Sequence, residues 1–148
     1  MRTRDKIAFV IYFLVFLTTI VFGVIYLFSP TIMPYHKEAI NLKWEDLSTG
    51  LQVLLQGFMK LTSAGFFVTG LSGMILLLIP FRHGEKWARC AVPSIGFVWN
   101  IFCLYVTSTV AIKTGASTPW PGLLIAMIMM LVAFMLSPSF GKDIKVGQ

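Results

Sequence analysis

Charged residues are scarce in this chain of 148 residues. They make up 12% of it, whereas 57% of the residues are hydrophobic. An ordinary soluble domain carries about a quarter charged residues. So few polar side chains cannot cover a water-soluble surface around this much apolar material, so the composition argues against a soluble fold and favours a membrane protein.

Cysteine and histidine are equally rare, with two of each. Cys90 and Cys103 would lie about 20 Å apart along one helix, too far to form a disulfide. His36 and His83 are expected at opposite faces of the membrane, and no His, Cys, Asp or Glu cluster has the spacing of metal ligands. We therefore expect no thiol redox site, haem, metal or other cofactor, and no catalytic residue.

Four long windows contain no Asp, Glu, Lys or Arg. They lie at 7–28, between Lys60 and Arg82, between Arg89 and Lys113, and between Lys113 and Lys142. The first three are long enough for a helix to cross a hydrocarbon core of about 30 Å. The fourth has a shorter apolar core, at 123–136, extended outward by 120–122. The windows predict an all-α protein and, because they hold no acidic residue, argue against proton-driven transport.

The predicted organisation is a single integral membrane domain, 1–148, that forms a four-helix transmembrane bundle of up-down topology. Its expected helices are 7–28, 51–79, 88–111 and 120–136, with an outer loop at 29–50. Within this loop we expect a short interfacial helix at about 37–47. The first apolar run is longer than that of a signal peptide and is not followed by a cleavage pattern, which predicts a retained helix.

The positions of Lys and Arg predict the orientation. Eight of the twelve fall on one side of the predicted membrane, namely Arg2, Arg4, Lys6, Arg82, Lys86, Arg89, Lys142 and Lys145. The other four are Lys37, Lys43, Lys60 and Lys113. The positive-inside rule places the first group, and both termini, in the cytoplasm of a cell that carries this multi-pass protein in its cell membrane. The net charge of +6 then reflects topology and contact with membrane lipids rather than nucleic acid.

Polar residues on the second helix suggest a candidate site. Gln52, Gln56 and Lys60 recur every four residues and share one helical face. Lys60 is expected near the outer interface, where a lysine that extends its amine toward water is favoured over a ligand-binding one. Further along, Gly65, Thr69 and Gly73 form a strip of small residues that predicts close helix packing.

Asn100 is the polar residue expected deepest in the third helix. Its predicted depth, near mid-bilayer, matches that of Thr18 and Thr19 and that of Thr69 or Ser72. An amide in lipid is costly unless it is hydrogen-bonded, so Asn100 is expected to face the interior and bond to hydroxyls of the first or second helix. A structural role is favoured, and a polar ligand bound by Asn100, Thr69, Gln56 and Lys60 is the alternative.

Three motifs occur in order along the chain. They are Tyr35-His36, the hairpin Pro80-Phe81-Arg82-x-Gly84-Glu85-x-Trp87-Ala88-Arg89 and the turn Thr114-Gly115-Ala116-x-Thr118-Pro119-Trp120. The set resembles a family of small bacterial four-helix integral membrane proteins, over about residues 35–121. The resemblance implies the same topology and a bacterial inner membrane, and it brings no activity with it.

Two hypotheses of function follow. The leading one is a non-enzymatic accessory, interaction or scaffold protein, in contact with a membrane-protein partner or with its own copies. The alternative is a binding protein or facilitator for a lipophilic small molecule. A filled core with Gly65, Thr69 and Gly73 at helix contacts would favour the first, whereas an open pocket lined by Gln56, Lys60 and Asn100 would favour the second.

Overall fold

The computed structural model describes residues 3–137, and this part of the chain is helical without a strand. Its longer helices are α1 (Thr3–Phe28), α3 (Thr49–Leu76), α4 (Ala88–Thr114) and α5 (Trp120–Leu136). The shorter ones are α2 (Pro34–Ile40), the 3₁₀ turn η1 (Trp44–Asp46) and the π-helical turn η2 (Leu77–Phe81). The all-α prediction is confirmed. Arg2, Lys142, Lys145 and the predicted cytoplasmic C-terminus lie outside the described residues.

Three helical segments are long and apolar enough to cross a membrane. They are Thr3–Phe28, Thr49–Phe81 and Ala88–Thr114. The helix α5 is also apolar but has only 17 residues, which corresponds to about 25 Å. The part of the chain described by the structure is therefore helical, with three candidate membrane spans and a fourth, shorter apolar helix.

The helix ends follow local sequence signals. Ser48 caps α3, and its hydroxyl accepts a hydrogen bond of 3.4 Å from the backbone N–H of Leu51. The expected interfacial helix at 37–47 is wrong, because Pro34 starts α2 earlier and Asn41 ends it in the left-handed conformation, with φ 51°. A separate turn, η1, follows. The helix α1 begins at Thr3, before the predicted residue 7, and α4 continues to Thr114 rather than 111.

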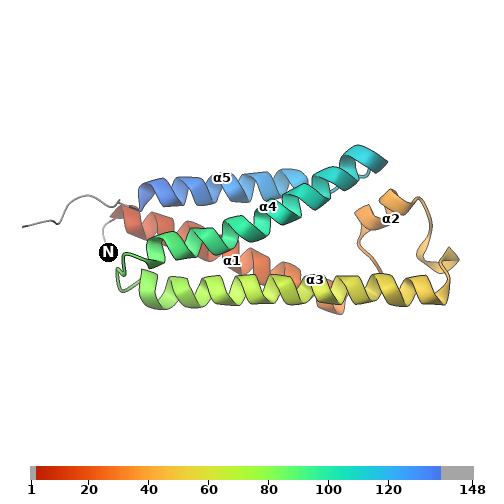
Figure 1. Ribbon diagram of the computed structural model, residues 1–148, viewed down its shortest axis with the longest axis horizontal. Coiled ribbons are helices and arrows are strands. Elements are labelled where there is room, and N and C mark those ends of the chain that lie inside the picture. Colours follow the sequence, from red (N-terminus) through yellow and green to blue (C-terminus); the bar gives the residue numbers. More distant parts are fainter. Residues whose placement is uncertain (1–2, 138–148) are drawn as a thin grey trace, which may run out of the picture.

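The four longer helices lie along one common axis, and α2 lies at the end remote from the N-terminus (Figure 1). The main packing partners of α1 are α3 and α5, and those of α4 are also α3 and α5. The helix α1 touches α4 much less. The helices thus surround a common centre in the order α1, α3, α4, α5, with α2 in contact with α4.

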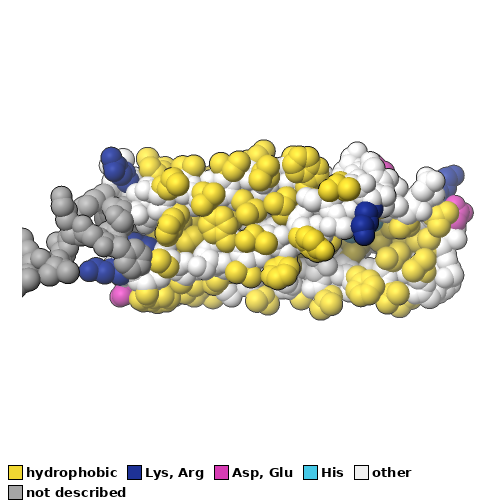
Figure 2. Space-filling view, turned by 45° about the horizontal axis from the view of Figure 1, so that its top comes forward, with side chains coloured by type: hydrophobic (Ala, Val, Ile, Leu, Met, Phe, Trp, Pro, Cys, Tyr) yellow, Lys and Arg dark blue, Asp and Glu magenta, His cyan; other side chains and the backbone are white. Residues whose placement is uncertain are grey.

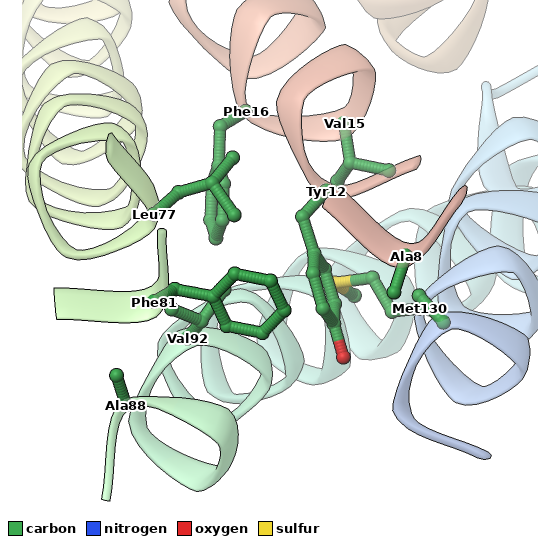
Figure 3. Close-up of a cluster of buried hydrophobic side chains, with 10 residues drawn as sticks. Ala8, Tyr12, Val15, Phe16, Leu77, Phe81, Ala88, Val92 and Met130 are labelled. Atoms are coloured by element: carbon green, nitrogen blue, oxygen red, sulfur yellow. The ribbon is translucent and has the colours of Figure 1, made fainter. Parts of the chain in front are cut away.

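Large side chains fill this centre at the end nearer the N-terminus (Figure 3). Tyr12 and Phe16 of α1 are fully buried there, and the Tyr12 ring meets the Phe81 ring edge-on, with centroids 5.8 Å apart. Leu77 of η2 and Met130 of α5 are also fully buried. The helices α1, α4 and α5 and the turn η2 contribute buried residues to this cluster, and Met74 and Leu76 at the end of α3 pack against it. The interior at this end is therefore packed, and the apolar side chains of the opposite helix faces point outward.

Those outward faces are apolar along most of the molecule (Figure 2). Large exposed hydrophobic side chains occur on every long helix, for example Leu14, Val68, Phe102 and Leu131. Lys and Arg side chains lie toward the two ends. This arrangement is the one that a hydrocarbon solvent favours, because apolar side chains need no burial there while charged ones must reach the interface.

Candidate functional site

The outer segment between α1 and α3 is tied to the rest of the molecule by three polar contacts. A carboxylate oxygen of Glu38, on α2, accepts a hydrogen bond of 2.8 Å from the backbone N–H of Ser117, in the turn between α4 and α5. The side-chain amide of Gln56 donates to the carbonyl of Pro30, also at 2.8 Å, and that of Gln52 donates to the carbonyl of Trp44. These contacts hold the segment across the end of the bundle.

A chain of aromatic rings runs from this segment into the interior. His36 packs against Tyr35, with centroids 4.3 Å apart, and against Tyr26, at 6.4 Å. The ring contacts continue from Tyr26 to Phe66 (5.3 Å) and from Phe66 to Trp99 (5.1 Å). The hydroxyls of Tyr26 and Tyr35 hydrogen-bond to each other. This aromatic chain connects α2 with α1, α3 and α4.

Burial changes the acid–base behaviour of the two ring residues on α2. It raises the pKa of the Tyr35 hydroxyl to about 12, with a smaller contribution from the nearby Cys103 thiol. It also lowers the pKa of His36, because the imidazolium form loses hydration there. Both shifts favour the neutral form, so the docked segment is adapted to pH values at which both side chains are uncharged.

The polar residues expected to form one site differ in their surroundings. Asn100 is buried, with 5% of its surface exposed, but its amide nitrogen donates to the carbonyl of Gly96, 2.8 Å away on the same helix. The expectation of hydroxyl partners on the first or second helix is therefore wrong. Gln56 is occupied by Pro30, and Lys60 is exposed. The hydrogen bonds of Asn100 and Gln56 thus go to two different backbone carbonyls.

The small residues of α3 receive side chains from two different neighbours. A Cβ built on Gly65 would lie 2.4 Å from the ring of Trp99, on α4. One built on Gly73 would lie 2.2 Å from the ring of Phe16, on α1. At Gly70 the backbone of α1 itself is close, with the carbonyl of Phe16 3.3 Å from such a Cβ. The strip therefore accommodates two large rings, and the close backbone approach occurs beside it.

One polar contact links α1 and α3 in the interior. The hydroxyl of Ser63 donates a hydrogen bond of 2.7 Å to the carbonyl of Gly23, and Ser63 is 1% exposed. The absence of a side chain at Gly23 gives the hydroxyl access to this carbonyl, because the nearest part of α3 would be 3.3 Å from a Cβ at Gly23. Sequence reasoning missed this pair, although Ser63 lies three residues after Lys60 on an otherwise apolar stretch.

Thr69 lies in a different place from the other candidate residues. It lines an open groove of about 310 Å³ between α3 and α4, together with Ile95, Val98, Trp99 and Phe102. Thr69 is itself 9% exposed. The groove is thus an aromatic and aliphatic surface with one buried hydroxyl at its edge.

Other chemistry is sparse in the part of the chain that the structure describes. Cys90 and Cys103 are free thiols. Residues 3–137 contain no group of three or more His, Cys, Asp or Glu side chains that could hold a metal ion. The described geometry offers two features for function, namely the docked outer segment with its aromatic chain and the groove at Thr69.

Comparison of the chain with protein-family models, with curated proteins and with solved structures returned no match. The resemblance drawn from the Pro80–Arg89 hairpin and the Thr114–Trp120 turn therefore stays an expectation.

Proposed function

We propose that this chain is a non-enzymatic integral membrane protein that acts as an accessory or scaffold subunit, bound to another membrane protein or to a second copy of itself. It crosses a cell membrane four times, as α1, α3 with η2, α4 and α5, with both termini in the cytoplasm. On the resemblance given above, this membrane is a bacterial inner membrane.

The filled centre of the bundle carries the proposal. The ring of Phe16 packs against Gly73, and the ring of Trp99 packs against Gly65. The small residues of α3 therefore lie at helix contacts. The side-chain amides of Gln56 and Asn100 donate hydrogen bonds to backbone carbonyls of the chain itself. A transporter or an enzyme of this size needs polar groups that converge on a cavity, whereas a scaffold needs a stable core and outward contact surfaces.

The charge distribution supports the orientation. Within the described residues, Arg4, Lys6, Arg82, Lys86 and Arg89 belong to the end where α1 starts and α3 connects to α4. The other four lysines of the described residues, Lys37, Lys43, Lys60 and Lys113, belong to the half that carries the outer segment. The more basic end belongs in the cytoplasm by the positive-inside rule. The short helix α5 is accommodated by a local thinning of the bilayer.

Site-specific photo-crosslinking in the native membrane tests this function. A photoreactive phenylalanine is placed at one exposed position per helix, at Leu14, Val68, Phe102 and Leu131, and in a matched control at the buried Phe16. An accessory or scaffold subunit gives a defined protein adduct, of this chain or of one partner, from one or two of the exposed positions and none from Phe16. Adducts with lipid alone from all four exposed positions would overturn the proposal.

A further inference from the structure

The groove between α3 and α4 lies near the middle of the membrane. Thr69 is about 14 Å along the helix axis from Lys60 and about 20 Å from Arg82. Trp99 is about 15 Å from Arg89 by the same measure. Charged lipid headgroups and bulk water are therefore remote from the groove, and whatever occupies it is surrounded by hydrocarbon.

Thr69 differs from the other buried threonines in its hydrogen bonding. The hydroxyl of Thr19 donates to the carbonyl of Val15 at 2.9 Å, and that of Thr118 donates to the carbonyl of Thr107 at 2.9 Å. The hydroxyl of Thr69 makes no hydrogen bond within residues 3–137, although more than nine-tenths of the residue is buried. In hydrocarbon, an unpaired hydroxyl is costly, so a ligand with an oxygen that accepts its hydrogen bond is bound more favourably.

The wall of the groove suits a flat ring. The Trp99 ring is fixed by Gly65 beneath it and by Phe66, whose ring meets it edge-on at 5.1 Å. Phe102 stands beside it and is 66% exposed. The ring nitrogen of Trp99 is a second buried polar atom without a hydrogen bond among the described residues. Fixed aromatic faces favour stacking with a planar ligand.

We infer that this groove binds a neutral lipophile with a planar ring and a ring carbonyl oxygen, such as an alkyl-substituted benzoquinone, with Thr69 as hydrogen-bond donor and Trp99 and Phe102 as stacking partners. An unsubstituted acyl chain fills the apolar part of the groove but offers no acceptor at this depth, and a lipid ester oxygen remains at the interface. The inference is independent of the proposed subunit function, because the groove is tested in the isolated chain.

Fluorescence of Trp99 provides the test. The variant Trp44→Phe, Trp87→Phe, Trp120→Phe keeps Trp99 as the only indole, and it is placed in lipid nanodiscs and titrated with decyl-substituted benzoquinone. We expect saturable quenching. Thr69→Val, which preserves the side-chain volume, should weaken the apparent affinity about three- to tenfold, the range expected for one interhelical-type hydrogen bond in a membrane. If the triple variant does not fold, the difference between wild type and Trp99→Phe supplies the same signal.

The matched control is Thr18→Val, which removes an exposed threonine hydroxyl at a similar depth on α1 and should leave the titration unchanged. Decylbenzene, which has the ring and tail but no oxygen, should compete poorly. Quenching that rises linearly without saturation, equal affinity in Thr69→Val, or equal competition by decylbenzene would each overturn the inference.

Discussion

At the scale of single residues, this molecule depends on small side chains that make room for large ones. Gly73 provides the space for the ring of Phe16, and Gly65 provides it for the ring of Trp99. Because lipid is as apolar as the helix surface, such packing is a main source of association between membrane helices. Each of these two glycines therefore leaves the space that one particular aromatic ring occupies.

Gly73→Ala should destabilise the protein more than a glycine replacement elsewhere on α3. The new methyl would lie 2.2 Å from the buried Phe16 ring, and overpacking of this kind costs about 1–3 kcal/mol. Gly57→Ala is the control, since nothing lies within 4 Å of a Cβ there. Thermal unfolding in detergent measures both. Equal stability of the two variants would contradict the described packing.

Ser63→Ala should lower the free energy of unfolding by about 0.6–1.7 kcal/mol. The change removes the hydrogen bond to the Gly23 carbonyl, which is buried between α1 and α3. Thr62→Ala serves as the neighbour control, because the Thr62 hydroxyl bonds to the Phe58 carbonyl of its own helix and the residue is only partly buried. Reversible unfolding in mixed micelles measures the difference, and an effect of Thr62→Ala as large as that of Ser63→Ala would refute it.

The candidate site could be predicted from the sequence only in part. The burial of Asn100 could be predicted because an unpaired amide in an apolar environment is costly, but its partner, the Gly96 carbonyl, could not. Hydropathy fixes how deep a residue lies and leaves open how each helix is rotated about its axis, because both faces of these helices are apolar. The same ambiguity hid the contacts of Gly65 and Gly73 with two different helices, and the pairing of Tyr26 with Tyr35.

At the scale of elements, the short helix α2 is the part of the fold most dependent on a few contacts. It contributes no buried residue of its own. Its attachment rests on Glu38, on the Tyr26–Tyr35 hydrogen bond and on the contact of the His36 ring with Tyr26. Few apolar contacts make an element prone to local opening, so α2 should respond to single changes that leave the long helices intact.

Glu38→Ala should release α2 from the turn between α4 and α5. The substitution removes the carboxylate that accepts from the Ser117 N–H, and this amide then exchanges with solvent. We expect hydrogen exchange at Ser117 to accelerate about tenfold, as for the loss of a hydrogen bond to a charged group. Glu45→Ala, in the exposed turn η1, should leave the exchange unchanged. Unaltered exchange in Glu38→Ala would contradict the described contact.

Docking of α2 should also depend on pH at two limits. The lowered pKa of His36 means that the docked segment binds a proton less readily than the free one, so docking is complete above the ordinary value of 6.5 and is lost as the pH falls below it. The raised pKa of Tyr35 means that docking is complete below pH 10 and is lost as the pH rises toward about 12.

Hydrogen exchange of α2 across this pH range, corrected for the intrinsic rate, measures both limits. His36→Phe, which keeps a ring against Tyr26 and Tyr35, should abolish the acid limit and retain the alkaline one. His83→Gln, in the exposed hairpin at the other end, should change neither. If the loss of docking at low pH persisted in His36→Phe, it would have to come from a group other than His36.

Element bounds were largely predictable because they depend on local signals. Charge-free windows located the long helices, and Trp120 and Pro121 marked the start of α5. The outer segment was harder, since Tyr35 and Trp44 were interpreted as interfacial anchors of one helix, whereas Pro34 and Asn41 delimit a shorter one. Local signals set the bounds of that stretch, whereas the hydrogen bond of Tyr35 to Tyr26 and the contact of α2 with α4 are tertiary and could not be predicted from the sequence.

At the scale of the whole molecule, the proposed orientation is open to a direct test. In a Cys90→Ser, Cys103→Ser background, Lys86→Cys and Lys43→Cys each place one thiol at an exposed position, in the hairpin and in the outer segment respectively. A membrane-impermeant maleimide should label Lys43→Cys on intact spheroplasts and Lys86→Cys only on inverted vesicles. The reverse pattern would contradict the proposed topology.

The contact between Glu38 and Ser117 joins residues 79 positions apart in the sequence. During synthesis at about 5–20 residues per second, the ribosome therefore needs roughly 4–16 s after adding Glu38 before its partner exists at all. Once α3 has also been synthesised, α1 and α3 can associate, while α2 still lacks its contact with the turn between α4 and α5. The Glu38 contact thus forms only after the turn between α4 and α5 is complete, and a stalled nascent chain that lacks this turn holds α2 only through earlier contacts such as those with Tyr26.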